Sequence, residues 1–144
     1  MKILLTLFLS LLLSLSASVS AEQSVTFDHI EVHYSAIPTT FLSPDIASNY
    51  RIQRSRYSAL LNIAILDRTQ DNQAMIASVH GSAANLLGNK KTLSFREIRE
   101  GSAIYYLAEV PHTHEEQYLF EILITTQGGV TNTLRFRQTF YSEE

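Results

Sequence analysis

Short runs in which apolar and polar residues alternate constrain this chain more than any other feature. The clearest run spans residues 130–141, where Leu134, Phe136 and Phe140 alternate with polar or charged residues. A repeat of two residues places the apolar side chains on one face of an extended strand and the polar side chains on the other. Such a strand covers a core with one face and meets water with the other, which is typical of antiparallel sheets.

Six further strands are predicted at short spacing, with turn residues between them, at 25–34, 57–66, 74–80, 91–99, 103–110 and 117–126. The run 57–66 is apolar on both faces, which predicts a strand in the middle of a sheet. About seven strands with almost no helix predict an all-β fold, an immunoglobulin-like antiparallel β-sandwich. The cysteine and tryptophan residues of true immunoglobulin domains are absent, and a closed or half-open barrel is the alternative architecture.

A short helix is predicted over Pro44–Asn49, in the first long connection between strands. Ser43 can cap its first turn, proline suits the first helical position, and Asp45 complements the positive end of the helix dipole. So short a helix is stable only when it is packed. We therefore expect it to lie against the end of the sandwich, held by Phe41, Leu42 and Tyr50.

The tract Gly81–Gly88 is rich in small residues and has a glycine at each end. Glycine inside a strand pattern often marks a bulge, a bend or a close approach of another backbone. The tract therefore predicts a bulge or a crossing between sheets.

Residues 1–21 have the pattern of a cleaved signal peptide. A positive Met1–Lys2 start precedes an apolar segment, and Val19–Ser20–Ala21 supplies the small residues of a cleavage site. The apolar segment is shorter than the roughly 20 residues that a membrane-spanning helix needs. We expect export to the periplasm and a single domain over residues 22–144, without a transmembrane segment.

Charge and cysteine usage exclude several classes of function. Without Lys2, 10 basic residues stand against 14 acidic ones, a net charge of −4. Binding to nucleic acid needs a positive surface, so nucleic acid is not an expected partner. The chain has no cysteine, which excludes disulfides, thiol catalysis and cysteine-based zinc sites.

Histidine is the residue type whose placement invites a metal. His29, Glu31 and His33 share one face of the first predicted strand, but the two histidines would lie roughly 13 Å apart, too far to share one zinc ion. The weak alternative to a solvated strand face is a metal site that is formed by Glu31, either histidine and a third ligand from elsewhere in the chain. The segment 112–116 (HTHEE) is interpreted as an exposed acidic loop that could take up a metal without being built for it. We assign no metal site.

Motifs of catalysis are missing. The sequence contains no nucleophile elbow, phosphate-binding loop or dinucleotide fingerprint. The carboxylate pairs Glu115–Glu116 and Glu143–Glu144 are expected to be exposed and hydrated, whereas catalytic carboxylates need perturbed surroundings. We predict a protein that is not an enzyme and needs no cofactor; a small-molecule hydrolase without a recognisable motif is an alternative.

A basic cluster precedes the central strand, where Arg51, Arg54 and Arg56 stand beside Tyr50 and Tyr57. It could clamp a carboxylate, a phosphate or an acidic partner, or its arginines could stack on the tyrosines and pair with a local acid such as Asp45. We predict a binding surface over 35–56 and its edges for a periplasmic or envelope protein. Its candidate residues are His33, Tyr34, Tyr50, Arg54 and Arg56.

Four segments, VHYSAIPTTFL, PDIASNYRIQRSRYSALLNIAIL, VHGSAANLLG and LSFREIREGSAIYYLAEV, together resemble domain-of-unknown-function family 4426. The resemblance covers nearly all of residues 22–144. It implies a small exported protein of Gram-negative gammaproteobacteria, with a single immunoglobulin-like domain and no established activity. The positions that match are His33, Tyr34, Phe41, Leu42, Tyr50, Arg54, Ser55, Asn62, Asn85, Leu87 and Gly88. The family implies no catalytic or ligand role for them.

Overall fold

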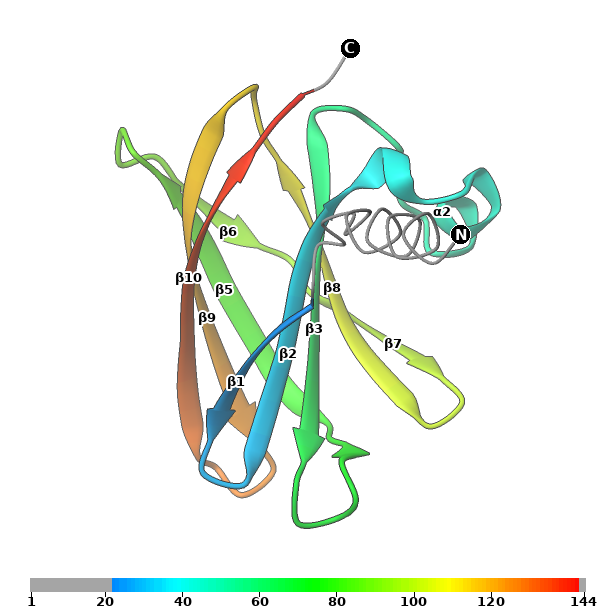
Figure 1. Cartoon of the computed structure of the whole chain (residues 1–144), viewed down its shortest axis with the longest axis vertical. Coiled ribbons are helices and arrows are strands. Elements are labelled where there is room, and N and C mark those ends of the chain that lie inside the picture. Colours follow the sequence, from blue (N-terminus) through cyan, green and yellow to red (C-terminus); the bar gives the residue numbers. More distant parts are fainter. Residues whose placement is uncertain (1–21, 143–144) are drawn as a thin grey trace, which may run out of the picture.

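The computed structural model describes residues 22–142, and within them ten strands form two antiparallel sheets (Figure 1). The first sheet has the spatial order β1 (Gln23–Phe27), β2 (Ile30–Pro38), β3 (Ser58–Asp67), β8 (Ala103–Pro111) and β7 (Arg96–Glu100), with β4 (Gln73–Ala74) also beside β3. The second sheet has the order β10 (Thr131–Phe140), β9 (Glu116–Thr126), β5 (Ala77–Asn85) and β6 (Lys90–Leu93). The predicted signal peptide lies outside the described residues.

The main core lies between the two sheets and follows the alternation in the sequence. Ala59, Leu61, Ile63 and Ile65 of β3 are fully buried on one face. They face the inward side chains of the second sheet, which include Tyr118, Phe120, Ile122, Ile124 and Leu134. The two sheets are separate rather than closed into one barrel. The predicted β-sandwich architecture is therefore what the structure contains.

The predicted first strand, 25–34, is instead a hairpin. β1 ends at Phe27 and pairs with β2 in antiparallel register, with Asp28 and His29 in the turn. Asp28 has φ 56°, a left-handed conformation that short polar residues tolerate in tight turns. Val25 and Phe27 face the same core as Ile30 and Val32, so the alternation changes phase at the turn, and a prediction of one straight strand does not account for this change.

The tract predicted as a bulge or a crossing is the regular second half of β5. Residues 81–85 pair with β9 without interruption. A Cβ at Gly81 would lie 2.6 Å from Ile122 Cδ1 and 2.9 Å from the backbone oxygen of Glu121. The glycine therefore marks a close approach of two strands, not a break in one of them.

The chain crosses between the sheets three times, after β4, after β6 and after β8, and the first two crossings divide predicted strands. It leaves the first sheet after β4 and enters the second at Ala77, so the predicted strand 74–80 is split. It returns after Leu93, and the predicted strand 91–99 becomes β6 and β7 in different sheets. These splits, with the β1–β2 hairpin, account for ten strands where about seven were expected.

The predicted helix is present as α2 (Pro44–Asn49), with Ser43 Oγ accepting the Ile46 N–H at 3.3 Å. It does not cover the end of the sandwich, however. Ala47 and Ile52 form a second, smaller core with Leu60 and Leu107 on the outer face of the first sheet. Leu42 and Tyr50 pack against this second core as expected, but Phe41 does not and is 74% exposed. Among residues 22–142, no helix is long and apolar enough to cross a membrane.

Candidate binding surface at the η1 end of the sandwich

The connection between β2 and β3 begins with a short 3-10 helix, η1 (Thr39–Phe41), and continues through α2. Thr39 is fully buried although it is polar. Its hydroxyl lies 2.9 Å from the Ser55 carbonyl oxygen and 3.1 Å from that of Ser58, and it accepts the Ser55 N–H at 2.9 Å. One side chain thus ties the start of the connection to its end. The sequence does not single it out, because its neighbour Thr40 is the same residue type.

β2 and β10 finish at the same end of the sandwich (Figure 1). A hollow of about 440 Å³ opens there, beside η1. We call it the end hollow. Its lining includes Ala36, Thr40, Phe41, Arg56, His112 and Tyr141. Gln138 Nε2 donates to the Ala36 carbonyl oxygen at 3.0 Å and bridges the edges of the two sheets there. The hollow therefore rests on both sheets.

Large side chains stand exposed around the end hollow. Phe41 and Tyr141 line it and are 74% and 57% exposed, and Tyr57, adjacent to Arg56, is 48% exposed. The Arg56 guanidinium lies over the Tyr57 ring, 5.0 Å from its centroid. Aromatic faces beside a cation offer a surface that an apolar or acidic group can contact.

The two predicted arginines differ in how they are used. Arg54 Nη2 donates to the Thr40 carbonyl oxygen at 2.9 Å, so Arg54 supports η1. Arg56 stacks on its neighbouring tyrosine and lines the end hollow. Within residues 22–142 neither forms an ion pair with an acid, and Asp45 is not a partner. Both arginines are exposed.

The other three predicted site residues lie elsewhere. His33 and Tyr34 point to opposite faces of β2: the Tyr34 ring packs on Phe136, with centroids 4.5 Å apart, while His33 faces outward. Tyr50 packs into the second core beneath α2. The five predicted residues thus do not form one site, and Arg56 is the one that lines the end hollow.

His112 lines the end hollow, although the sequence did not indicate it as a site residue. It was predicted in an exposed loop, but it is buried and stacks on Phe140, with ring centroids 5.0 Å apart. Its Nδ1 donates to the Thr113 carbonyl oxygen at 2.9 Å. His114, two residues on, is exposed as expected. No local pattern distinguishes the two histidines, because the stacking partner is far away in sequence.

Glu116 also departs from its predicted exposed setting. Its carboxylate accepts hydrogen bonds from Asn85 Nδ2 at 3.1 Å, the Thr113 N–H at 3.0 Å and the Tyr118 hydroxyl at 2.8 Å. Desolvation alone would raise the pKa of Glu116, but these donors outweigh it and hold the pKa below its usual value. Burial, and then the nearby Glu116 carboxylate, raise the pKa of Tyr118. Glu116 is therefore a structural anchor.

Of the three residues of the metal alternative, Glu31 and His33 lie together and His29 lies apart from them. His33 Nε2 lies 3.2 Å from Glu31 Oε1, and His33 Nδ1 lies 3.8 Å from Glu22 Oε2. His29 instead lies in the β1–β2 turn, with Nδ1 3.4 Å from Asp28 Oδ2. No group of three or more potential ligand side chains is placed for a metal ion in the part of the chain that the structure describes. Metal binding stays a prediction, which metal analysis of protein purified without added metal would test.

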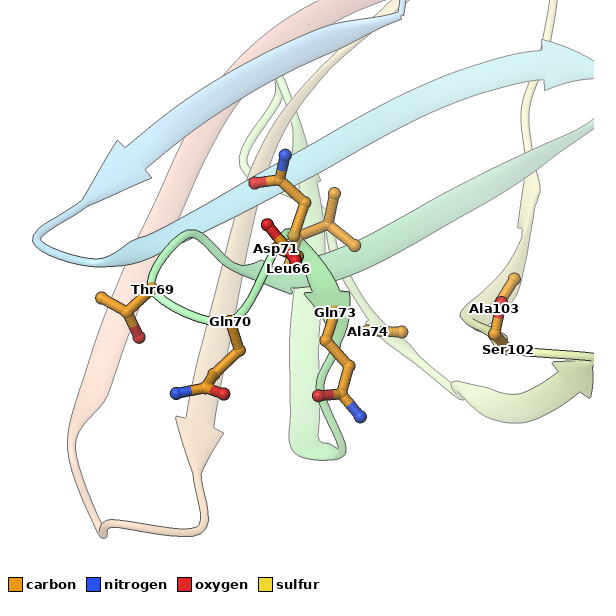
Figure 2. A pocket seen from close by; sticks show the side chains of 9 residues that line it. Leu66, Thr69, Gln70, Asp71, Gln73, Ala74, Ser102 and Ala103 are labelled. Carbon is orange, nitrogen blue, oxygen red and sulfur yellow. The ribbon is translucent and has the colours of Figure 1, made fainter.

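A hollow of about 760 Å³ lies at the opposite end of β3, between the loop after β3 and the turn before β8 (Figure 2). Thr69, Gln70 and Gln73 point in different directions, and Ser102 lies apart from them on the other side (Figure 2). Polar groups that bind one ligand must converge. This hollow is a gap between turns, and it offers no constellation for chemistry.

Comparison with known proteins gives the family. Residues 24–143 match the protein family described as "Domain of unknown function (DUF4426)". The chain belongs to the DUF4426 family. The crystal structure of a DUF4426 family protein from Pseudomonas aeruginosa is similar to this chain at 30% identity and a TM-score of 0.77, covering 88% of this chain and 99% of that one. The resemblance read from the sequence is confirmed.

More distant structures share the fold. A copper-bound variant of FetP from uropathogenic Escherichia coli has 12% identity and a TM-score of 0.59, over 86% of this chain and 92% of that one. FetP as isolated after expression in the periplasm has 12% identity and a TM-score of 0.60, over 86% and 96%. At this identity the likeness concerns the fold alone. A comparison with curated proteins found no match.

Proposed function

We propose that this DUF4426 protein is an exported binding module that holds a protein or another envelope component without catalysing a reaction. The observation that carries the proposal is the rim of Phe41, Arg56, Tyr57 and Tyr141 at the end hollow. Aromatic residues and arginine dominate the binding energy of protein interfaces, where they fill or border pockets. Exposed aromatic side chains gathered in one place are unusual on a soluble monomer without a partner.

The rigidity of the surface supports a binding role. The side chains of Thr39 and Arg54 hold η1 through hydrogen bonds to backbone carbonyl oxygens, and Gln138 ties the two sheets below it. A surface that is already ordered loses less conformational entropy when it binds. The rim is therefore presented in a preorganised form.

The strand order supports an immunoglobulin-like interpretation of the sandwich. The order β2–β3–β8–β7 corresponds to A–B–E–D of immunoglobulin constant domains, and β10–β9–β5 corresponds to G–F–C. In such folds, segments that connect strands at the ends of the sandwich commonly carry the binding surface. The end hollow has this position.

A periplasmic location is part of the proposal. The family match begins at residue 24, directly after the predicted cleavage site at Ala21. FetP, which shares the fold, was expressed in the periplasm. The absence of cysteine leaves the domain independent of the redox conditions of that compartment. The partner is thus sought among envelope components.

The test is quantitative co-purification from an envelope extract of the organism that carries the gene. The variant with Phe41→Ala and Tyr141→Ala together removes two exposed rings and should leave the fold intact. We expect it to recover at least about tenfold less of the partner than the wild type does, because interface anchors of this kind each contribute about 2 kcal/mol or more.

The control is Val130→Ala, which truncates an exposed apolar residue in the β9–β10 turn at the opposite end of the sandwich (Figure 1). It should recover the partner as the wild type does. Recovery of no partner by the wild type, or equal recovery by the rim variant and the wild type, contradicts the proposed function.

A further inference from the structure

β2 has an open edge where it borders the end hollow. β3 pairs with one side of β2 along its whole length, but β1 pairs with the other side as far as Tyr34 and no further. The His29 carbonyl oxygen accepts the Arg68 N–H at 2.8 Å, and hydrogen-bonded pairs alternate along an antiparallel ladder, so the odd-numbered residues of β2 hydrogen-bond to β3. The backbone N–H and C=O of Ala36 therefore point away from β3, where no strand of the range 22–142 pairs with them.

β10 presents a second open edge at the same hollow. The Thr126 N–H donates to the Val130 carbonyl oxygen at 3.2 Å, in line with the register of β9 and β10, so the even-numbered residues of β10 hydrogen-bond to β9. The backbone groups of Thr139 point the other way, and β10 is the last strand of its sheet. Ala36 and Thr139 both line the end hollow. Two open strand edges thus border one hollow.

One added strand can pair with both edges. β2 and β10 run in the same direction and finish at the same end of the sandwich, so a segment that runs the opposite way is antiparallel to both (Figure 1). The Gln138 side chain already spans from β10 to β2, where it donates to the Ala36 carbonyl oxygen at 3.0 Å, and that oxygen has a second lone pair for another donor. Open edges are templates for pairing, and proteins recognise extended peptides by adding them to such an edge.

The side chains at the mouth of the end hollow indicate the chemistry of the added segment. Arg56 is exposed and forms no ion pair with an acid among residues 22–142. A segment antiparallel to β2 enters at the η1 end with its N-terminal part, so an acidic residue there would meet the Arg56 guanidinium. Phe41 and Tyr141 offer exposed aromatic rings to apolar side chains of the same segment.

We propose that the end hollow takes an extended segment of a protein partner, which adds as a β-strand between Ala36 and Thr139 and places an acidic residue near its N-terminal end at Arg56. The inference rests on the proposed function and names the kind of partner that the rim binds. A backbone N–H of the segment donates to the Ala36 carbonyl oxygen, and a backbone carbonyl oxygen accepts the Ala36 N–H. Main-chain pairing supplies affinity, while Arg56 and the aromatic rim select the side chains.

The test is an NMR titration of ¹⁵N-labelled protein that begins at Glu22, with the probe peptide acetyl-Asp-Val-Thr-Val-amide. The probe should shift the amide signals of residues 36, 37, 139 and 140. It should also slow hydrogen exchange at the Ala36 amide at least about threefold, because that amide becomes hydrogen-bonded. A probe methylated on the backbone nitrogen of both valines keeps its side chains but loses its donors to one edge, and should bind at least about tenfold more weakly.

Variants of the protein test the two edges and the charge. Thr139→Pro removes an N–H that points away from β9, which an edge strand tolerates, and should weaken probe binding at least about threefold. Thr133→Pro is the matched control, because it makes the same change on the same edge outside the end hollow, and it should bind the probe as the wild type does. A probe with lysine in place of aspartate should bind about threefold more weakly, and Arg56→Gln should remove that difference.

Equal binding of the probe and its methylated form, or equal binding by the Thr139→Pro and Thr133→Pro variants, overturns the proposal. A dimer of the protein alone in light scattering that the probe dissociates also overturns it, because the open edges would then belong to a second copy. If the wild type recovers a partner from envelope extract that the double rim variant loses, but the probe does not displace that partner, this inference fails and the proposed function stands.

Discussion

Thr39 and Thr40 are neighbours of the same type, yet they have opposite roles. Thr39 is fully buried and joins three backbone groups, whereas Thr40 is exposed and contributes its carbonyl oxygen to Arg54. A buried hydroxyl is stable only when it is hydrogen-bonded, and here the bonds also fix the connection that carries the rim. The Thr39 side chain therefore determines whether the connection that carries the rim of the end hollow is ordered.

Thr39→Val should therefore destabilise the protein. Valine fills nearly the same space, but it leaves the Ser55 N–H and two carbonyl oxygens without their side-chain partner. We expect a loss of about 2–4 kcal/mol in the free energy of unfolding, since unsatisfied buried groups cost about 1–3 kcal/mol each. Denaturant unfolding measures it, and Thr40→Val is the matched control, expected within about 0.5 kcal/mol of the wild type. Equal stability of the two variants would refute the role given to Thr39.

At the scale of elements, β5 shows how closely two strands can lie. It pairs with β9 along its whole length, and Gly81 leaves room for Ile122 and for the backbone of β9. The side chain of Ile122 can move, but the Glu121 carbonyl oxygen belongs to the sheet and cannot move by itself. The glycine at position 81 is thus required by the close packing of β5 against β9.

Gly81→Ala should destabilise the domain by about 1–3 kcal/mol, the usual cost of overpacking a well-filled core. Thermal or denaturant unfolding measures the effect. Gly128→Ala is the control, because an added Cβ there meets nothing within 4 Å and the residue has no positive φ. If the Gly81 variant is as stable as the control, the close approach of β5 and β9 is not a constraint.

At the scale of the whole molecule, the Glu116 carboxylate links the two sheets at the η1 end. It holds Asn85 at the end of β5 and Thr113 in the loop that leaves β8. Tyr118, fully buried in β9, donates to Glu116 and also lies 3.0 Å from the Pro111 carbonyl oxygen at the end of β8. The stability of the domain should therefore depend on the charge of this one carboxylate.

The direction of the pH dependence follows from the lowered pKa of Glu116. Its unfolded value is 4.5, and its folded pKa is lower, so its contribution is complete above pH 4.5 and is lost as the pH falls through the folded pKa. Glu116→Gln should cost about 1–3 kcal/mol at pH 7, because the new amide would face the Asn85 Nδ2 donor.

Denaturant unfolding from pH 7 to pH 3 measures this dependence. The difference in stability between wild type and Glu116→Gln should shrink as the pH falls below 4.5. Glu115→Gln, at an exposed neighbouring position, should follow the wild type. A difference that stays constant down to pH 3 would show that the carboxylate charge is not what stabilises the fold.

Local rules in the sequence predicted much of the secondary structure, but not the division of three predicted strands. The period of two predicted the buried faces of β8, β9 and β10, and Ser43 with Pro44 predicted the bounds of α2. These features depend on contacts within a few residues, so the sequence alone determined them, together with the all-β class and the family. Of the candidate site, the connection and Arg56 were predicted, but the rim was not.

Only the tertiary structure decided which strands pair and what their side chains meet. The alternation changes phase within 25–34 and within 91–99, but a change of phase alone does not say whether a strand bulges, turns back on itself or crosses to the other sheet. His112 and His114 look alike until Phe140, far along the chain, covers one of them. Asn62 is a polar residue in an apolar strand, and only the structure shows that its side-chain oxygen is buried without a hydrogen-bond partner among residues 22–142. Each of these outcomes depends on contacts between residues distant in sequence, which local periodicity cannot specify.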